Sequence, residues 1–180
     1  HRSFRKPLVI MTPKSLLRYK YCISNIEDFS KENSFHRVMW DHALDPKTKG
    51  FIKLKESKKI KKVILCSGKI YFDLLEAREK LKRDDVIFYR IEQLYPFPAK
   101  TLVKELKPYA KKAKFYWCQE EPKNMGSWSS VRDYIQWTLD NIGVKREIEY
   151  IGRNQAASPA TGYANRHMKQ QKEIIDKVFY

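Results

Sequence analysis

The sequence predicts an α/β protein, a three-layer open sandwich built on a mostly parallel sheet of about five strands. Short apolar segments alternate along the chain with segments whose apolar residues recur at helical spacing. The apolar segments are continuous rather than alternating, which is typical of parallel strands covered by helices on both faces. A chain of 180 residues is long enough to bury the core of one such domain.

The first strand is expected at residues 6–11, with a short helix at 15–18 after it. Residues 19–60 carry Asn, Asp-Pro and Gly without strong periodicity, so we expect a long irregular excursion that contains one short strand within 35–40. Further strands are expected at 63–66, 86–91, 115–118 and 147–151. Helical periodicity is present in 70–81, 102–110, 131–142 and 168–178.

Three widely spaced cysteines are an odd number and form no C-x-x-C pair. Cys66 and Cys118 each end an apolar run, so we expect buried thiols and a reducing compartment. The four histidines are scattered, and no metal site is expected. No apolar stretch approaches the length of a membrane span, and no signal peptide is visible. Because the chain opens on His1, we expect a processed protein or a piece of a longer one.

A net charge of +16 and a dense run of six lysines between Lys53 and Lys62 raise the question of nucleic-acid binding. No helix-turn-helix, zinc-finger spacing or RNP signature accompanies the charge. A solvated, lysine-rich surface is therefore the favoured interpretation. A surface for an acidic partner stays open as an alternative for the Lys53–Lys62 run.

Two basic turns are candidate phosphate sites. The turn Ser67-Gly68-Lys69 lies between an expected strand and an expected helix, where backbone N–H groups and a lysine suit a phosphate. The alternative is an ordinary tight turn. Ser15 and Arg18 follow the first expected strand, at a second helix N-terminus.

Glu120 and Glu121 follow the apolar run 115–118 directly, before Pro122. This order predicts an acidic turn at the carboxyl edge of the sheet, where open α/β sheets bind ligands. General acid–base chemistry is one interpretation of the pair. A structural role is favoured, because adjacent turn residues point in different directions and a carboxylate just before a helix stabilises its N-terminus.

Several long motifs in fixed order carry a resemblance to a known family. They are residues 5–18 (RKPLVIMTPKSLLR), 66–75 (CSGKIYFDLL), 90–98 (RIEQLYPFP), 119–128 (QEEPKNMGSW), Gly152-Arg153 with 157–160 (ASPA), and His167 with Gln170-Gln171. Across residues 4–180 the chain resembles the C-terminal domain of the E1 component of 2-oxoglutarate dehydrogenase.

The resemblance implies a transketolase C-terminal-like fold, with residues 1–180 forming a single domain of a larger E1 chain. The family decarboxylates 2-oxoglutarate with thiamine diphosphate and Mg, and passes the succinyl group to the lipoyl arm of E2 dihydrolipoyl succinyltransferase in the tricarboxylic acid cycle. Its E1 chains form homodimers, in the bacterial cytoplasm or the mitochondrial matrix. The phosphate and magnesium motif of the family is absent here, so we expect no catalytic or cofactor-binding residue in this chain and no activity from it alone.

The resemblance also implies regulatory positions, since some members bind acetyl-CoA or AMP on this domain. The matching candidates are Ser15, Arg18, Lys69 and Arg78. Candidates for structural or interface roles are Glu120, Glu121, Trp128 and His167. Partners are expected to be the other E1 domains, a second E1 copy and E2, without nucleic acid or membrane. Two alternatives remain, namely the same fold in another thiamine enzyme and a basic α/β module that binds nucleic acid.

Overall fold

The computed structural model describes residues 3–30, 33–45 and 48–180. Residue contacts divide the chain into two compact units, His1–Ser34 and Phe35–Tyr180. The first unit carries two short 3₁₀ helices, η1 (Lys14–Leu16) and η2 (Ile26–Phe29). The second unit holds the sheet and the α-helices.

The strand expected at 6–11 is wrong, because residues 5–13 adopt no regular structure. Leu8, Val9, Ile10 and Met11 are all exposed. A β-strand needs a neighbour to pair its backbone N–H and C=O groups, and no other strand lies among the described residues of this unit. The helix expected at 15–18 is the single turn η1.

The second unit forms a five-stranded sheet in the order β1-β3-β2-β4-β5, which confirms the predicted fold class. The strands are β1 (Val38–Met39), β2 (Lys62–Cys66), β3 (Val86–Ile91), β4 (Lys114–Pro122) and β5 (Glu149–Arg153). β1 is the short strand expected within 35–40, and it pairs antiparallel with β3 at one edge. All other pairs are parallel.

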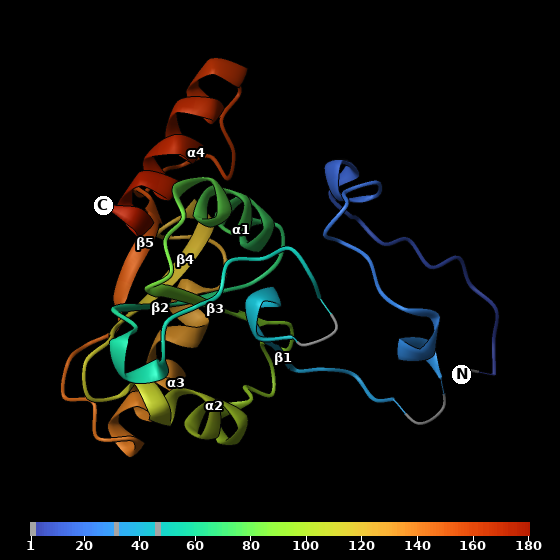
Figure 1. Ribbon diagram of the computed structural model, residues 1–180. Helices are drawn as coiled ribbons and strands as arrows, with labels where there is room; N and C mark the ends of the chain where they lie inside the picture. The colour runs from blue at the N-terminus through green and yellow to red at the C-terminus, as the bar shows by residue number, and fades with distance from the viewer. Residues whose placement is uncertain (1–2, 31–32, 46–47) are drawn as a thin grey trace. The chain divides into compact units, whose positions relative to one another are not determined.

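Helices cover both faces of this sheet (Figure 1). They are α1 (Ile70–Leu81), α2 (Ala99–Leu106), α3 (Trp128–Asn141) and α4 (Ala164–Phe179). α1 packs with α4, and α2 packs with α3. None of the helices in the described part of the chain is both long and apolar enough to cross a membrane.

Strand β2, at the centre of the sheet, is buried on both faces, which explains its continuous apolar sequence. Val63 and Leu65 of β2 join one core cluster with apolar residues of α2 and α3. Ile64 and Cys66 alternate with them and are also fully buried. A pleated strand directs successive side chains to opposite faces, so each face of β2 packs beneath its own helical layer.

The prediction of buried thiols is confirmed for both central cysteines. Cys66 and Cys118 are free, buried and directly opposite each other in the β2–β4 register. Burial raises the pKa of Cys66 to about 12 and that of Cys118 well above its usual value. Neither thiol therefore ionises near neutral pH, and both behave as small apolar core groups.

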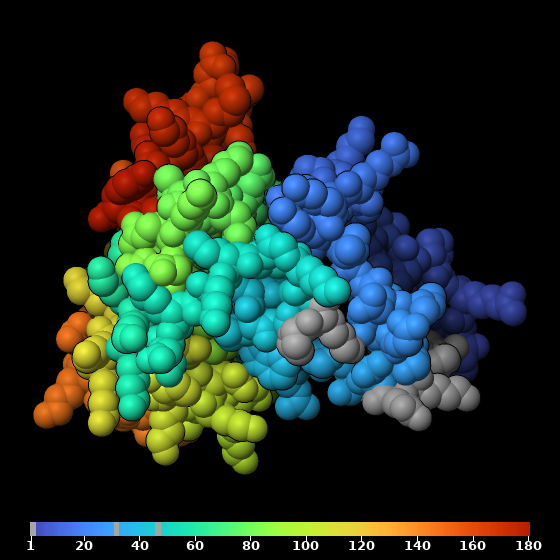
Figure 2. Space-filling view, viewed as in Figure 1, coloured from blue at the N-terminus to red at the C-terminus, as the bar shows by residue number. Residues whose placement is uncertain are grey.

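Two further 3₁₀ helices pack together at the amino edge of the sheet, where the parallel strands begin. They are η4 (Ser57–Lys59), just before β2, and η5 (Lys107–Tyr109), just before β4. Figure 2 shows the two segments, teal and yellow, meeting on the surface. The ammonium of Lys62 reaches the C-terminus of α4 and donates to the Val178 carbonyl at 2.7 Å. The helix C-terminus favours a cation, but burial and the charge of Arg83 lower the pKa of Lys62.

A buried ion pair joins the segment between β1 and β2 to α1. Arg78 and Asp41 have no exposed side-chain surface, and the guanidinium donates to both carboxylate oxygens, with Nη2 2.8 Å from Oδ1. The carboxylate also accepts the backbone N–H groups of Ala43 at 2.9 Å and Phe88 at 3.0 Å. Burial opposes the guanidinium charge, but Asp41 outweighs burial and the pKa of Arg78 is raised.

The turn between β4 and α3 is organised by a glutamine. Gln119 is buried, and its Oε1 accepts from the Trp117 indole at 2.9 Å and from the Trp128 backbone N–H at 3.0 Å. Its Nε2 donates to the Met125 carbonyl at 2.7 Å. Gly126 has a φ of +66°, and a Cβ there would lie 2.9 Å from Gln119 Nε2. The turn therefore excludes a side chain at this glycine.

Removing the carboxylate of Asp41 should strongly destabilise the chain. We expect Asp41→Ala to lower the free energy of unfolding by about 3–5 kcal/mol, because it leaves the Arg78 charge buried and unpaired. Urea unfolding followed by circular dichroism measures the change. Glu76→Ala removes the partner of Lys80 in an exposed pair and should cost no more than about 0.5 kcal/mol. Similar losses in the two variants would contradict a special role for Asp41.

Gly126→Ala should destabilise the chain by about 1–3 kcal/mol, because it forces alanine into the left-handed region and against Gln119. Gly162→Ala is the matched control, since a Cβ at Gly162 meets nothing within 4 Å. Differential scanning calorimetry measures the melting temperature of each variant, and we expect Gly126→Ala to melt at the lower temperature. Equal melting temperatures for Gly126→Ala and Gly162→Ala would contradict the exclusion of a side chain at Gly126.

Candidate functional site

The carboxyl edge of the sheet opens where β2 and β4 lie side by side. β2 leads into α1 on one face, whereas β4 leads into α3 on the other. Adjacent parallel strands whose helices leave to opposite faces form the crevice in which α/β sheets commonly bind ligands. Lys69, in the turn after β2, and Glu120, near the end of β4, occupy this place. Gly68 makes the turn possible with a φ of +73°.

Lys69 is held between two carboxylates. Its Nζ lies 2.6 Å from Asp73 Oδ2 and 2.9 Å from Glu120 Oε1. Its side chain is 26% exposed. Burial works against the ammonium charge, but hydrogen bonds to Asp73 and Glu120 outweigh burial, so the pKa of Lys69 is raised. Lys69 is therefore a fixed cation that joins the end of β4 to the start of α1.

The polar network continues to α4 through Gln171. The Gln171 amide donates to Asp73 Oδ2 at 2.8 Å. Its oxygen faces Nη2 of Arg153, the last residue of β5, at 3.4 Å. The same Arg153 nitrogen lies 3.0 Å from His167 Nδ1. Because a guanidinium can only donate, Nδ1 accepts and His167 is neutral in this contact, with its hydrogen on Nε2. We call Glu120, Lys69, Asp73, Gln171, Arg153 and His167 the carboxyl-edge network.

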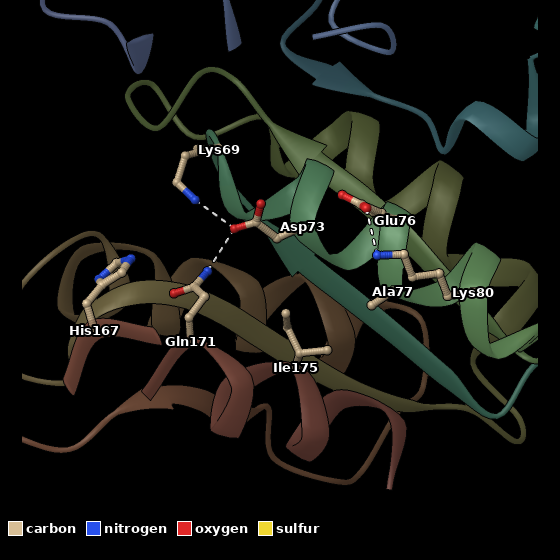
Figure 3. Close-up of a pocket in the computed structure, with 8 residues that line it drawn as sticks. All are labelled: Lys69, Asp73, Glu76, Ala77, Lys80, His167, Gln171 and Ile175. Carbon is tan, nitrogen blue, oxygen red and sulfur yellow. Dashed lines mark hydrogen bonds and ion pairs between the residues drawn. The ribbon is translucent and has the colours of Figure 1, made fainter. Parts of the chain in front are cut away.

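A cavity of about 350 Å³ lies between α1 and α4, beside this network. Figure 3 shows Lys69, Asp73 and Gln171 linked along one side of it. Its lining residues are Lys69, Asp73, Glu76, Ala77, Lys80, His167, Gln171 and Ile175. Two lysines and two carboxylates are among them, so the cavity offers a polar ligand contacts of both signs.

The arrangement is suited to binding and to holding elements together. The Lys69 ammonium is already paired with two carboxylates. The buried thiols of Cys66 and Cys118 stay protonated because burial raises their pKa. In the described ranges, no group of three or more His, Cys, Asp or Glu side chains is placed to hold a metal ion.

The four candidate effector residues lie in different settings. Ser15, in η1, and Arg18 belong to the first unit, and both are exposed. Lys69 belongs to the carboxyl-edge network in the second unit. Arg78 is fully buried and its guanidinium is paired with Asp41, so it has no exposed donor for a nucleotide phosphate.

The acidic turn expected at Glu120 and Glu121 is instead strand, because β4 continues to Pro122 and pairs there with Arg153 of β5. Alternation along the strand separates the two carboxylates: Glu120 binds Lys69, whereas Glu121 is exposed. Trp128 is buried at the start of α3 and packs on Tyr150, with ring centroids 5.3 Å apart.

Sequence reasoning missed Asp73, Arg153 and Gln119 as organising residues. The Lys69–Asp73 spacing of four residues on a helix was a readable signal for an ion pair. Arg153 ends a strand at the edge where ligands bind, which was a weaker signal. The role of Gln119 depends on partners from β4, the turn and α3, and no local pattern identifies them.

Comparison with known proteins adds two findings. A family model described as 2-oxoglutarate dehydrogenase C-terminal matches residues 23–179. The 2-oxoglutarate dehydrogenase E1 component of Brucella abortus (strain S19) is 55% identical over 176 residues, which cover 97% of this chain and 17% of that protein. The same component of Brucella anthropi is 54% identical over the same shares. The chain thus spans about a sixth of the length of these relatives.

A solved structure named "Split gene transketolase, inactive beta4 tetramer" shares the fold, with a TM-score of 0.50 and 15% sequence identity, over 84% of this chain and 44% of that one. Identity this low supports the fold alone, in agreement with the five-stranded, mostly parallel sheet described above. The sequence match is far stronger, and the family model covers the segment that holds the carboxyl-edge network. The chain therefore belongs to the 2-oxoglutarate dehydrogenase C-terminal family.

Proposed function

We propose that this chain is the C-terminal domain of a 2-oxoglutarate dehydrogenase E1 component. The observation that carries the proposal is 55% identity across 97% of the chain to a protein of that name. The complete protein would decarboxylate 2-oxoglutarate and pass the succinyl group to the lipoyl arm of E2 dihydrolipoyl succinyltransferase. The bacterial source of these relatives supports a place in the bacterial cytoplasm.

Thiamine diphosphate and Mg would be held by the rest of the E1 polypeptide. The described residues offer no cluster of metal ligands, and the one fixed lysine at the carboxyl edge is already bound by two carboxylates. The part played by this chain would be assembly: completing the E1 homodimer and packing against the catalytic domains. The carboxyl-edge network supports this role, because it fixes β4, β5, α1 and α4 to one another without using a catalytic group.

A chimeric enzyme tests the assembly role directly. The matching C-terminal segment of the Brucella abortus E1 component is replaced by residues 4–180 of this chain. We expect the chimera to regain 2-oxoglutarate decarboxylation to within about tenfold of the intact relative, whereas the truncated relative has none, since core and edge contacts tolerate conservative exchange. Decarboxylation is measured by reduction of an artificial electron acceptor, and this chain alone is expected to be inactive.

Two outcomes would contradict the proposal. A stably folded chimera that shows no decarboxylation would mean that this chain cannot complete an E1 component. Activity in the isolated chain would place catalytic groups within it. Circular dichroism and size-exclusion chromatography on the same preparation separate a failure of function from a failure to fold.

We also propose that the domain senses acetyl-CoA or AMP through Lys69, and in the first unit through Ser15 and Arg18. Exposure supports the assignment for Ser15 and Arg18, and the cavity beside Lys69 supports it there. Arg78 is left out of the proposed set because its guanidinium is buried and paired. Lys69 would have to exchange a carboxylate for a phosphate when the effector binds.

A thermal-shift titration tests the effector proposal. At about ten times the dissociation constant, acetyl-CoA or AMP should raise the melting temperature by about 3–5 °C, because a ligand that binds only the folded state stabilises it. Ser15→Ala, Arg18→Gln and Lys69→Gln are tested separately, and each should reduce the shift. Lys104→Gln, on exposed α2 surface, controls for lost charge. No shift with either ligand at millimolar concentration would rule out an effector site on this chain.

A further inference from the structure

Two lysine segments that are far apart in the sequence meet at the amino edge of the sheet. η4 packs against η5, and the Lys114 backbone N–H donates to the Lys61 carbonyl at 2.8 Å. This pairing brings the residues before β2 next to the residues before β4 (Figure 2). The exposed lysines that it gathers, which we call the amino-edge lysine cluster, are Lys58, Lys107, Lys111, Lys112 and Lys114.

Most other lysines of the 53–62 run already have structural partners. Lys55 binds Asp84 at 2.9 Å, Lys59 lies 3.5 Å from Glu56, and Lys61 lies 3.5 Å from Asp85. Lys62 binds the end of α4. The charge of the run is therefore partly neutralised within the fold. Of the two remaining lysines of the run, Lys53 and Lys58, only Lys58 belongs to the cluster.

The five cluster lysines differ in having no ion-pair partner within 4.0 Å among the residues that the structure describes. All five are exposed on one edge of the molecule. Like charges gathered in this way produce a positive potential that extends about 8 Å into physiological salt and repel one another. A partner that brings negative charge would relieve this repulsion.

The side chains around the cluster limit the kind of partner. None of the exposed large apolar side chains lies in 52–62 or 107–116, so these segments themselves offer neither a wedge for a membrane nor a platform for stacked bases. The exposed Tyr180 belongs to another segment, two residues beyond the α4 carbonyl that Lys62 binds. The carboxylates of Glu56, Asp84 and Asp85 lie in the neighbouring segments. These carboxylates limit the extent of the positive surface, which favours a short acidic segment over a long, continuous phosphate backbone.

We propose that the amino-edge lysine cluster is a docking surface for an acidic polypeptide segment. It lies at the opposite edge of the sheet from the carboxyl-edge network, so docking leaves that network free. The contact would be electrostatic, with fast association and strong dependence on salt. This inference concerns a surface outside the effector positions and does not depend on the proposed enzyme activity.

The test compares two quadruple variants of the full 180-residue chain with the same change in net charge. The cluster variant carries Lys58→Gln, Lys107→Gln, Lys111→Gln and Lys112→Gln. The control carries Lys100→Gln, Lys123→Gln, Lys169→Gln and Lys172→Gln, all exposed residues outside the amino edge. Binding of a fluorescent poly-L-glutamate peptide, duplex DNA and phosphatidylglycerol vesicles is measured at low and physiological salt, after circular dichroism has shown that both variants fold.

We expect the cluster variant to weaken poly-L-glutamate binding about tenfold, as the sum of four modest charge contacts, and the control to weaken it less than about twofold. Equal weakening by the two variants would mean that only net charge matters, and would overturn the proposal. Cluster-dependent binding that is tighter for DNA or for vesicles than for the peptide would also overturn it, in favour of that other partner.

Discussion

The buried pair of Asp41 and Arg78 is the interaction on which the second unit depends. One carboxylate holds the guanidinium of α1, the start of η3 (His42–Leu44) and the backbone of β3. Burying two charges is costly, and here the cost is offset only because every oxygen of Asp41 has a donor. The pair therefore ties the segment that follows β1 to both α1 and β3.

The two edges of the sheet handle charge in opposite ways. At the carboxyl edge, Lys69 is paired with two carboxylates, and Arg153 contacts the Gln171 amide oxygen and His167 Nδ1, so the network links β4, β5, α1 and α4. At the amino edge, Lys55, Lys59 and Lys61 are paired with carboxylates. The five lysines of the amino-edge cluster have no ion-pair partner among the residues that the structure describes. The carboxyl edge therefore holds strands and helices together, whereas the amino edge attracts negatively charged partners at long range.

Local pattern was sufficient wherever an element is buried on both sides. The strands at Val86–Ile91 and Lys62–Cys66 agree closely with the expected ranges, because continuous burial leaves a continuous apolar run in the sequence. The helix at Ile70–Leu81 also agrees, because its buried residues recur at helical spacing. The expectation was wrong at 6–11, where an apolar run has no strand to pair with. It was also wrong at Glu120 and Glu121, where pairing with β5 extends a strand through residues that resemble a turn.

The sequence by itself determined the fold class, the central strands, the buried cysteines and, through its motifs, the family. These properties depend on periodicity and on residues close together in the chain. Tertiary structure decided which charges meet, namely Arg78 with Asp41 and Lys69 with Glu120. It also decided that the segments η4 and η5, which carry lysines, lie in contact. The physical reason is that an ion pair depends on distances of a few ångströms in space, and strand order sets those distances independently of separation along the chain.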